Sequence, residues 1–478
     1  MNNVLHALAR FSSELRFEDL PAEVVYETKR MLLDSIGVSL AAHAVRKGQM
    51  CIALSRRLGG LPEATILGAA GKVGASHAAL ANGELINALD YDALFIPGGH
   101  VAPYIVPGIL AMAEARNASG RDLILALAIG NEVAMRVTRG MSPMVLTVRD
   151  EHASQSYRWT NPYGGSRYNL GAAAGIGRLL QLDPERMTHA LGLSGHHTQV
   201  PTHSKMSYTL PIPMTKYGTP GWQSTGAIVA ALLAEMGYEG DTTLFEGKSG
   251  LFSFTGSDAW MPEKVLPGLR EEWALLEQQY KPYPCCRVTH TCLDLFYELQ
   301  AAHGWTAGDI DKIDMYASAY AEKPHLQNKV VRNAMDAQFS AAYAMTMAVF
   351  GVPIGVEWLE PHNYLSASVH SFMERVTCRV HPQYTQKPLE DKLMILGRVD
   401  VTVRGQTHSR EKSFARGTPR PGFGLSDDDL AKKFLHNGAR LFDAGPLQDV
   451  VDEVLALQNS GSLGPLMKKL RPEESASS

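Results

Sequence analysis

Two aspartates and a histidine share one short stretch of the chain. The segment "NALDYDALFIPGGHVAP" carries Asp90 and Asp92, and His100 follows a Pro-Gly-Gly turn. An unperturbed histidine has a pKa of about 6.5, which suits proton transfer near neutrality, and an aspartate can orient its ring. The stretch therefore predicts a general acid–base site in which His100 moves a proton and one of the two aspartates orients its ring. The alternative is a polar loop with a structurally satisfied histidine.

Cations gather near prolines and glycines in two later stretches. "PMTKYGTPG" carries Lys216, and "KPYPCCRVTHTCLD" carries Lys281, Arg287 and His290. Fixed cations in a pocket recognise carboxylates, and an arginine can do so with two parallel hydrogen bonds. These stretches therefore predict a carboxylate-binding site. Surface loops with solvated lysines are the alternative.

Other motifs that suggest a cofactor or a metal lack the spacing they need. "FEGKSG" has Thr242 where a phosphate-binding loop requires its first glycine, so we reject that interpretation. "CCRVTHTC" offers thiols and an imidazole, but no second ligand pair follows at zinc-like spacing. His196, His197 and His203 have no acidic partner at metal spacing, which favours core or loop packing. We therefore expect no metal.

The elements that must position these residues fall into two kinds. Helical periodicity and small residues dominate the first half, with Ser119 as an N-cap ahead of Asp122 and little strand signal. The predicted helices there are 22–42, 74–89, 104–116, 117–137, 169–182, 183–195 and 225–237. Alternating strands are predicted later, at 311–320, 374–381 and 397–405, around a helix at 333–351 that Gly351 ends. Helical sequence returns from 426 to 470.

This change of pattern divides the chain into three parts. We expect a helical domain at 1–266, an α+β domain at 267–405, and a helical segment at 406–478 that packs back on the first. The segment "RGTPRPGFGLS" reads as the linker to that last part. The prediction is therefore a mainly α protein.

Composition narrows the class of protein. A net charge of -4 gives no basic excess for a nucleic-acid partner. Apolar stretches such as 101–113 are too short and too broken by proline to span a membrane, and the first residues have no signal-peptide pattern. The odd cysteine count, with three of the five clustered, favours reduced thiols and a cytoplasmic protein.

Taken together, these stretches resemble the MmgE/PrpD family, which includes 2-methylcitrate dehydratase, cis-aconitate decarboxylase and iminodisuccinate epimerase. The likeness covers nearly the whole chain, and the order and spacing of its segments make it specific. The segments that carry it are 32–42, 81–103, 119–137, 214–240, 244–254, 281–290, 337–351 and 425–434.

The resemblance implies a fold and a kind of ligand. A large all-helical domain would be built from both chain ends, with a smaller α+β lid inserted between them. The protein would be a homodimer without a metal or an organic cofactor. Its site would lie in a cleft between the domains and would take small di- or tricarboxylates.

The resemblance also implies roles for individual residues. His100, Asp90 and Lys216 fall at catalytic positions of the family pattern, where His100 would move a proton and Asp90 would orient its ring. The remaining matched residues would bind substrate, and they are Asp92, Asn161, Lys281, Arg287, His290 and Tyr320.

The chain departs from the family pattern at several positions. Ala93 and Leu94 stand where Asp and Thr are usual, and Val101 and Thr219 replace a proline and a histidine. Asn161 stands where the family often has a second catalytic histidine. An amide can hydrogen-bond a substrate but cannot titrate as an acid or base.

We therefore expect a cofactor-independent lyase that dehydrates a 2-methylcitrate-like substrate or decarboxylates a cis-aconitate-like one. An epimerase of an imino- or amino-dicarboxylate such as iminodisuccinate is the alternative enzyme. The departures from the pattern also leave open a family member that binds a carboxylate without chemistry.

Overall fold

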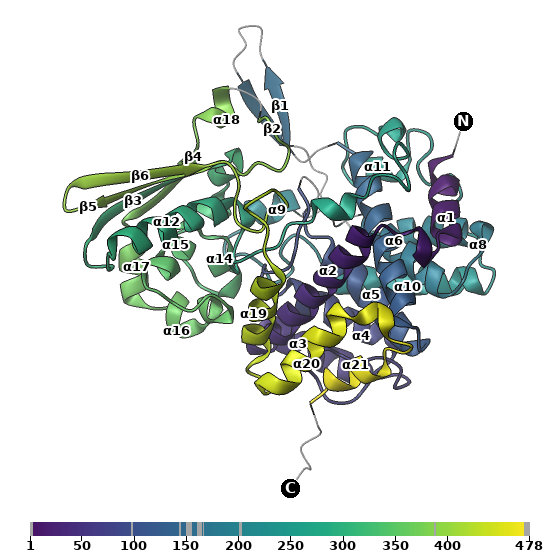
Figure 1. Ribbon diagram of the computed structural model, residues 1–478. Helices are drawn as coiled ribbons and strands as arrows, with labels where there is room; N and C mark the ends of the chain where they lie inside the picture. Colours follow the sequence, from purple (N-terminus) through teal and green to yellow (C-terminus); the bar gives the residue numbers. More distant parts are fainter. Residues whose placement is uncertain are drawn as a thin grey trace.

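The computed structural model describes residues 3–96, 99–142, 145–149, 155–159, 165, 167–199, 203–386 and 389–472 and is mainly helical (Figure 1). The first half of the chain forms the helices α1 (Val4–Glu14), α2 (Ala22–Ala41), α3 (Arg46–Leu58), α4 (Ala75–Asn87), α5 (Ala102–Ala115), α6 (Gly120–Arg139), α7 (Asn169–Leu179), α8 (Pro184–His196), α9 (His203–Ser207), α10 (Pro220–Glu235) and α11 (Leu251–Phe254). The helices predicted for this half are confirmed, although α10 begins earlier than its prediction.

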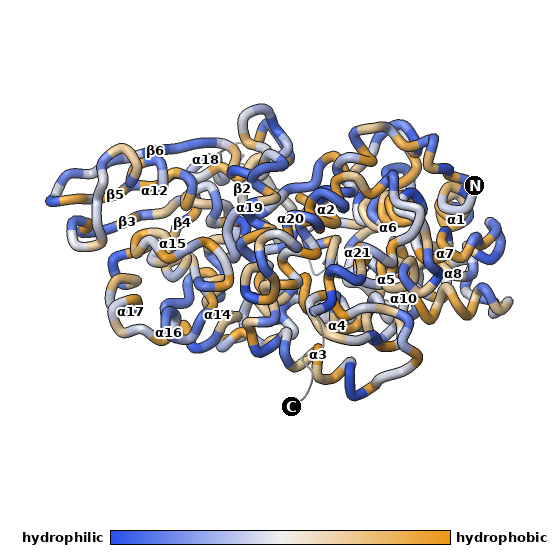
Figure 2. The backbone as a smooth tube through the Cα atoms, turned by 60° about the horizontal axis from the view of Figure 1, so that its bottom comes forward, coloured by the Kyte–Doolittle hydropathy of each residue, from blue (hydrophilic) through white to orange (hydrophobic). Residues whose placement is uncertain are grey.

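Local sequence explains where these helices begin. Ser119 caps α6 by accepting a hydrogen bond from the backbone of Asp122, whose side chain accepts one from the backbone of Ser119 in return. This reciprocal capping box satisfies two backbone donors that the first turn would otherwise leave unpaired. The predicted start of this helix is thus confirmed. Figure 2 shows hydrophobic residues concentrated among the packed helices.

Glycines let the helices α4 and α10 approach each other closely. An added Cβ at Gly221, near the start of α10, would lie 2.0 Å from the carbonyl oxygen of Leu80 in α4. One at Gly83 would lie 2.6 Å from the backbone of Gly221. Only glycine tolerates such distances. The close crossing places the loop before α10 against the carboxyl end of α4.

The carboxyl end of the chain packs on its amino end. It forms α19 (Asp427–Gly438), α20 (Ala444–Leu455) and α21 (Gly464–Lys469), drawn in yellow beside the purple α2 in Figure 1. Phe434 of α19 is buried against Gly37 of α2, where an added Cβ would meet its ring at 3.0 Å. Arg30 of α2 donates to the Leu425 carbonyl and pairs with Asp427. These contacts fix α19 on α2.

A sheet and further helices lie to one side of the first-half helices (Figure 1). In the described residues its strand order is β4-β3-β5-β6, with β3 parallel to β4 and antiparallel to β5. Helices α12 and α15 pack on the sheet. The elements of this part are α12 (His290–His303), β3 (Ile310–Ala317), α13 (Pro324–Gln327), α14 (Ala334–Phe339), α15 (Ala341–Val349), α16 (Pro361–Tyr364), α17 (Ala367–Met373), β4 (Val376–Val380), α18 (Gln383–Gln386), β5 (Gly397–Val403) and β6 (Gln406–Lys412).

The three strands predicted for this part are confirmed, and two local expectations are corrected. The helix expected at 333–351 is two helices, because Ser340 leaves the helical conformation, donates to the Asn328 carbonyl and caps α15 through the backbone of Tyr343. The first half also contains an antiparallel pair, β1 (Val145–Arg149) and β2 (Gln155–Trp159), where little strand signal was found.

The polar strand β6 forms an edge of the sheet, and it is mostly blue in Figure 2. Its charged and polar side chains protect that edge from pairing with another chain. Within the described residues, no helix has the length and apolar character to cross a bilayer.

Candidate functional site

A two-residue backbone bridge brings the acidic loop to the cationic segment. Leu94 and Gln279 exchange backbone hydrogen bonds of 2.8 Å in both directions. Lys281 lies two residues beyond this bridge, so its side chain reaches back to Asp90. The close approach of α4 and α10 brings Lys216 to the same point, where its Nζ donates to the carbonyl of Asn87 at 2.8 Å.

The carboxylate of Asp90 is the centre of the site. Its Oδ1 accepts from Lys216 Nζ at 2.9 Å and from the Tyr217 hydroxyl at 3.0 Å, and its Oδ2 accepts from Lys281 Nζ at 2.5 Å. All three charged side chains are buried, with exposed fractions of 1% or less. Asp90 and Lys216 both have left-handed backbones, with φ of 53° and 51°. Such strain persists where the surrounding contacts enforce it.

Burial and charge shift the pKa values of this cluster in definite directions. Burial alone would raise the pKa of Asp90, but the ammonium groups of Lys216 and Lys281 outweigh it and hold that pKa well below its usual range. Burial lowers the pKa of Lys216 to about 8, against the opposing effect of Asp90. Asp90 is therefore an anion near neutrality, and Lys216 is a cation that loses its proton in mildly alkaline solution.

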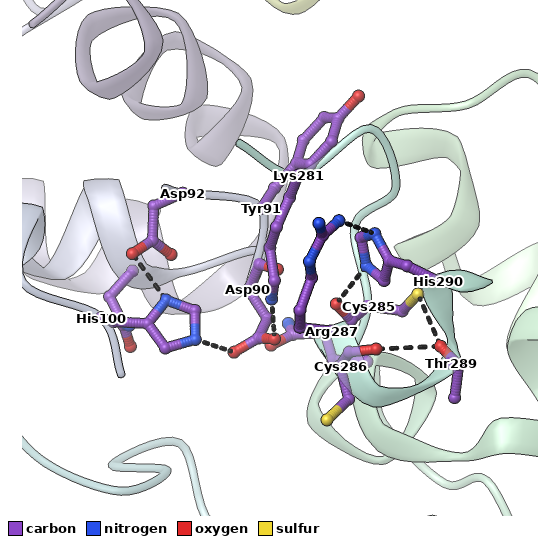
Figure 3. A network of polar contacts seen from close by, with 12 residues as sticks. Asp90, Tyr91, Asp92, His100, Lys281, Cys285, Cys286, Arg287, Thr289 and His290 are labelled. Carbon is purple, nitrogen blue, oxygen red and sulfur yellow. Dashed lines mark hydrogen bonds and ion pairs between the residues drawn. The ribbon is translucent and has the colours of Figure 1, made fainter. Parts of the chain in front are cut away.

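His100 is held between the two carboxylates (Figure 3). Its Nδ1 lies 2.7 Å from Asp92 Oδ2, and its Nε2 lies 3.6 Å from Asp90 Oδ1. The ring stacks on Tyr217 with centroids 5.0 Å apart. A carboxylate is an acceptor, so Nδ1 carries the hydrogen and Nε2 holds the lone pair of the neutral ring. Asp92 thus orients the ring, the role that sequence reasoning gave to Asp90.

Arg287 and His290 form a hydrogen-bond network beside the Asp90 cluster (Figure 3). Arg287 donates to Gln279, to Thr418, to the carbonyls of Ala415 and Arg416, and to His290 Nδ1. His290 Nε2 lies 3.1 Å from the Cys285 carbonyl. Burial and the guanidinium lower the pKa of His290 well below its usual range, so the ring is neutral. In this conformation both residues position the chain, and their binding of substrate stays a prediction.

Tyr320 lies beside a histidine that sequence reasoning assigned to packing. The Tyr320 hydroxyl lies 2.7 Å from His203 Nε2 and 3.1 Å from Ser207 Oγ. The His203 ring is 5.6 Å from the Tyr320 ring and 6.3 Å from that of Tyr217, which stacks on His100. Burial, with the nearby His325 and Lys323, lowers the pKa of His203 to about 3.

Two of the positions that depart from the family pattern make backbone hydrogen bonds that hold the acidic loop. Ala93 donates its backbone N–H to Asp34 of α2 at 3.0 Å, and Leu94 forms the bridge to Gln279. Asn161 lies outside the described residues, and its substrate-binding role stays a prediction. No cluster of three or more His, Cys, Asp or Glu side chains that could hold a metal is present in the described ranges.

Comparison with known proteins bears on this arrangement. The MmgE/PrpD N-terminal domain matches residues 6–262, and the MmgE/PrpD C-terminal domain matches residues 283–457. The chain belongs to the MmgE/PrpD family. The resemblance read from the quoted segments is therefore confirmed.

Three relatives align with this MmgE/PrpD chain over nearly its whole length. A cis-aconitate decarboxylase-like protein of Aspergillus oryzae is 26% identical over 98% of this chain and 98% of its own length. The cis-aconitate decarboxylase of Mus musculus is 22% identical over 98% of this chain and 94% of its own. That of Homo sapiens is 23% identical over 100% of this chain and 97% of its own.

The first prediction concerns the central carboxylate. Asp90→Asn leaves two buried ammonium groups without their shared counter-ion, so we expect a loss of about 3–5 kcal/mol in the free energy of unfolding. Urea denaturation at pH 7 measures it. Glu18→Gln, which breaks the exposed pair with Arg121, is the control and should change stability by less than about 0.5 kcal/mol. An Asp90→Asn loss as small as that would contradict the pairing.

Proposed function

We propose that this MmgE/PrpD protein is a cofactor-independent lyase that acts on a small di- or tricarboxylate. The observation that carries the proposal is the buried unit of His100, two aspartates and two lysines. It combines a proton-transfer group with fixed cations, the two elements that lyase chemistry beside a carboxylate requires.

His100 transfers the proton in this proposal. Asp92 at Nδ1 fixes the tautomer, so Nε2 is the nitrogen that takes a proton from substrate or returns one. Asp90 Oδ1 lies 3.6 Å from Nε2, on the side of the ring where the proton is exchanged.

Lys216 and Lys281 supply the positive charge. Each ammonium has three N–H groups, and among the described residues each meets two acceptors: Asp90 and the Asn87 carbonyl for Lys216, and the carboxylate and carbonyl of Asp90 for Lys281. The remaining N–H of each lysine can donate to a substrate carboxylate or to the enolate-like intermediate.

We propose that the sheet-bearing part acts as a lid over the site formed by His100, Lys216 and Lys281.

Decarboxylation of a cis-aconitate-like substrate is the favoured reaction, because the similar full-length proteins carry that name. The bond from carbon to one carboxylate breaks and carbon dioxide leaves. The electron pair left on carbon takes the proton on Nε2 of His100, which must carry that proton before the step and is neutral after it. Dehydration of a 2-methylcitrate-like substrate would use the same groups: Nε2 of the neutral His100 removes the C–H proton and then gives it to the departing hydroxyl, which leaves as water. Epimerisation of an iminodisuccinate-like compound is the alternative.

Tyr320 and His203 provide a second hydrogen-bonding group for either reaction. Burial raises the pKa of Tyr320 well above its usual value, so the phenol keeps its proton. A neutral phenol donates a hydrogen bond to a substrate oxygen or carbanion rather than acting as a base. We propose this donor role for Tyr320 in place of the titrating histidine that Asn161 replaces.

The second prediction tests the reaction directly. Proton NMR in D2O with 2-methylcitrate, citrate, cis-aconitate and iminodisuccinate should show loss of carbon dioxide or water from one of them. His100→Gln should lower kcat/KM on that substrate by about 10²–10⁴-fold, the usual contribution of general acid–base catalysis. His6→Gln replaces an exposed histidine of α1 and should retain full activity.

Each contrary outcome points to a different function. Deuterium uptake at an α-carbon without bond cleavage would indicate an epimerase. Thermal stabilisation by a carboxylate without turnover would indicate a binding protein. Full activity of His100→Gln would contradict the catalytic assignment.

The third prediction is a loss of activity in mild alkali. Burial and the charges of Asp90, Lys47 and Asp92 set the pKa of Lys216 at about 8, so this side chain loses its charge as the pH rises through 8. We expect kcat/KM to fall there. The pKa of Lys216 is lower in the folded protein than in the unfolded chain. Between pH 8 and about 10.5 the unfolded chain therefore binds more protons, and Lys216 makes the free energy of unfolding rise with pH. Melting temperatures measured at each pH will separate the loss of activity from unfolding. A kcat/KM that stays constant up to pH 10 would contradict the predicted role of the Lys216 charge.

The fourth prediction is that the protein is a homodimer, as the resemblance implies. Trp222, Val229 and Met236 recur at every seventh residue along and just beyond α10 and are exposed, which leaves an apolar stripe that a second copy can cover. Light scattering should give twice the chain mass of 52.1 kDa. Trp222→Glu should halve it, and a wild-type mass of one chain would contradict the proposal.

A further inference from the structure

One buried lysine near the site has no N–H left for a ligand. Lys433 of α19 donates to Asp34 Oδ1 at 2.7 Å, to the Tyr91 carbonyl at 2.8 Å and to the Lys281 carbonyl at 3.0 Å. Its Nζ also lies 3.8 Å from the centre of the Tyr91 ring. The side chain is 7% exposed. All three donors therefore hold other parts of this chain, unlike those of Lys216.

The partner of this lysine holds the same loop from the other side. Asp34 is fully buried as a side chain, and its Oδ2 accepts the backbone N–H of Ala93 at 3.0 Å. The pair therefore contacts the backbone directly before Asp92 and directly after it. It also contacts the backbone of Lys281, whose ammonium binds Asp90.

We propose that Asp34 and Lys433 are a positioning pair that sets the placement of Asp90, Asp92 and Lys281 for catalysis. This inference rests on the proposed function for its kinetic consequence. A buried ion pair contributes little net stability compared with apolar residues of similar size. Its three backbone contacts instead fix the acidic loop and the cationic segment relative to each other, and a displacement of about 1 Å at an active site lowers the rate by about 10²-fold.

The rigid mounting of the pair supports this role. Helices α2 and α19 are fixed to each other by the buried Phe434 and by the contacts of Arg30 with Leu425 and Asp427. Side chains mounted on packed helices hold a loop better than side chains on other loops do.

The test separates positioning from stability with a double variant. Lys433→Met or Asp34→Asn alone unbalances a buried charge, so we expect each to lower Tm by several degrees. The double variant D34N/K433M has no unpaired charge and should recover most of that Tm. It still lacks the donors to Tyr91 and Lys281, so we expect kcat to stay about 10²-fold low with a smaller change in KM.

Hydrogen exchange measured by mass spectrometry gives a readout without turnover. In D34N/K433M, peptides that cover 88–96 and 279–283 should exchange at least about tenfold faster than in the wild type, with other core peptides unchanged. The matched control is E132Q/R136M, which removes another buried pair. That pair holds the backbone at Val265 and Ala274, so its loss should speed exchange there and leave kcat within about twofold.

The outcomes separate this inference from the proposed function. Wild-type kcat and wild-type exchange at 88–96 in D34N/K433M would overturn the positioning role. A general rise in exchange across the core would also overturn it, because the pair would then serve the fold as a whole. If the wild type turns over no substrate, the proposed function fails, and the exchange pattern still decides whether the pair holds the loop.

Discussion

The buried carboxylate of Asp90, held by two ammonium groups, constrains the rest of the structure. A buried charge is tolerated when its counter-ions are in place, and loss of a partner costs about 3–5 kcal/mol, against a total stability of about 5–15 kcal/mol for a typical domain. The meeting of the loop after α4, the loop before α10 and the segment before α12 therefore contributes a large share of the stability of the fold.

Periodicity and capping predicted most of the helices and three strands, because these signals are local. The break at Ser340 depends on a carbonyl twelve residues away, and β1 and β2 lie in the half of the chain for which no strand was predicted. The residues of the candidate site were predicted because Asp, His and Lys stand beside turns, and because their order resembles that of a family.

Other site residues could not be predicted, because their surroundings look ordinary. Lys432 and Lys433 are adjacent on α19, yet their side chains are 72% and 7% exposed. The period of the helix places Lys433 near the buried face of Leu430 and Phe434 and Lys432 opposite it, but it does not predict the carbonyls that hold Lys433, since these come from distant segments. His203 was assigned to packing for lack of an acidic partner, and its neighbour is a tyrosine 117 residues along the chain.

The position of Lys433 has a consequence for how the protein becomes active during synthesis. A ribosome makes α2 and the acidic loop before the sheet-bearing part, and it makes α19 after it. Until α19 emerges, Asp34 lacks its counter-ion, and the carbonyls of Tyr91 and Lys281 lack the ammonium that holds them. A nascent or truncated chain that lacks α19 therefore carries every proposed catalytic side chain without the ion pair that aligns them, and activity would begin when α19 docks on α2.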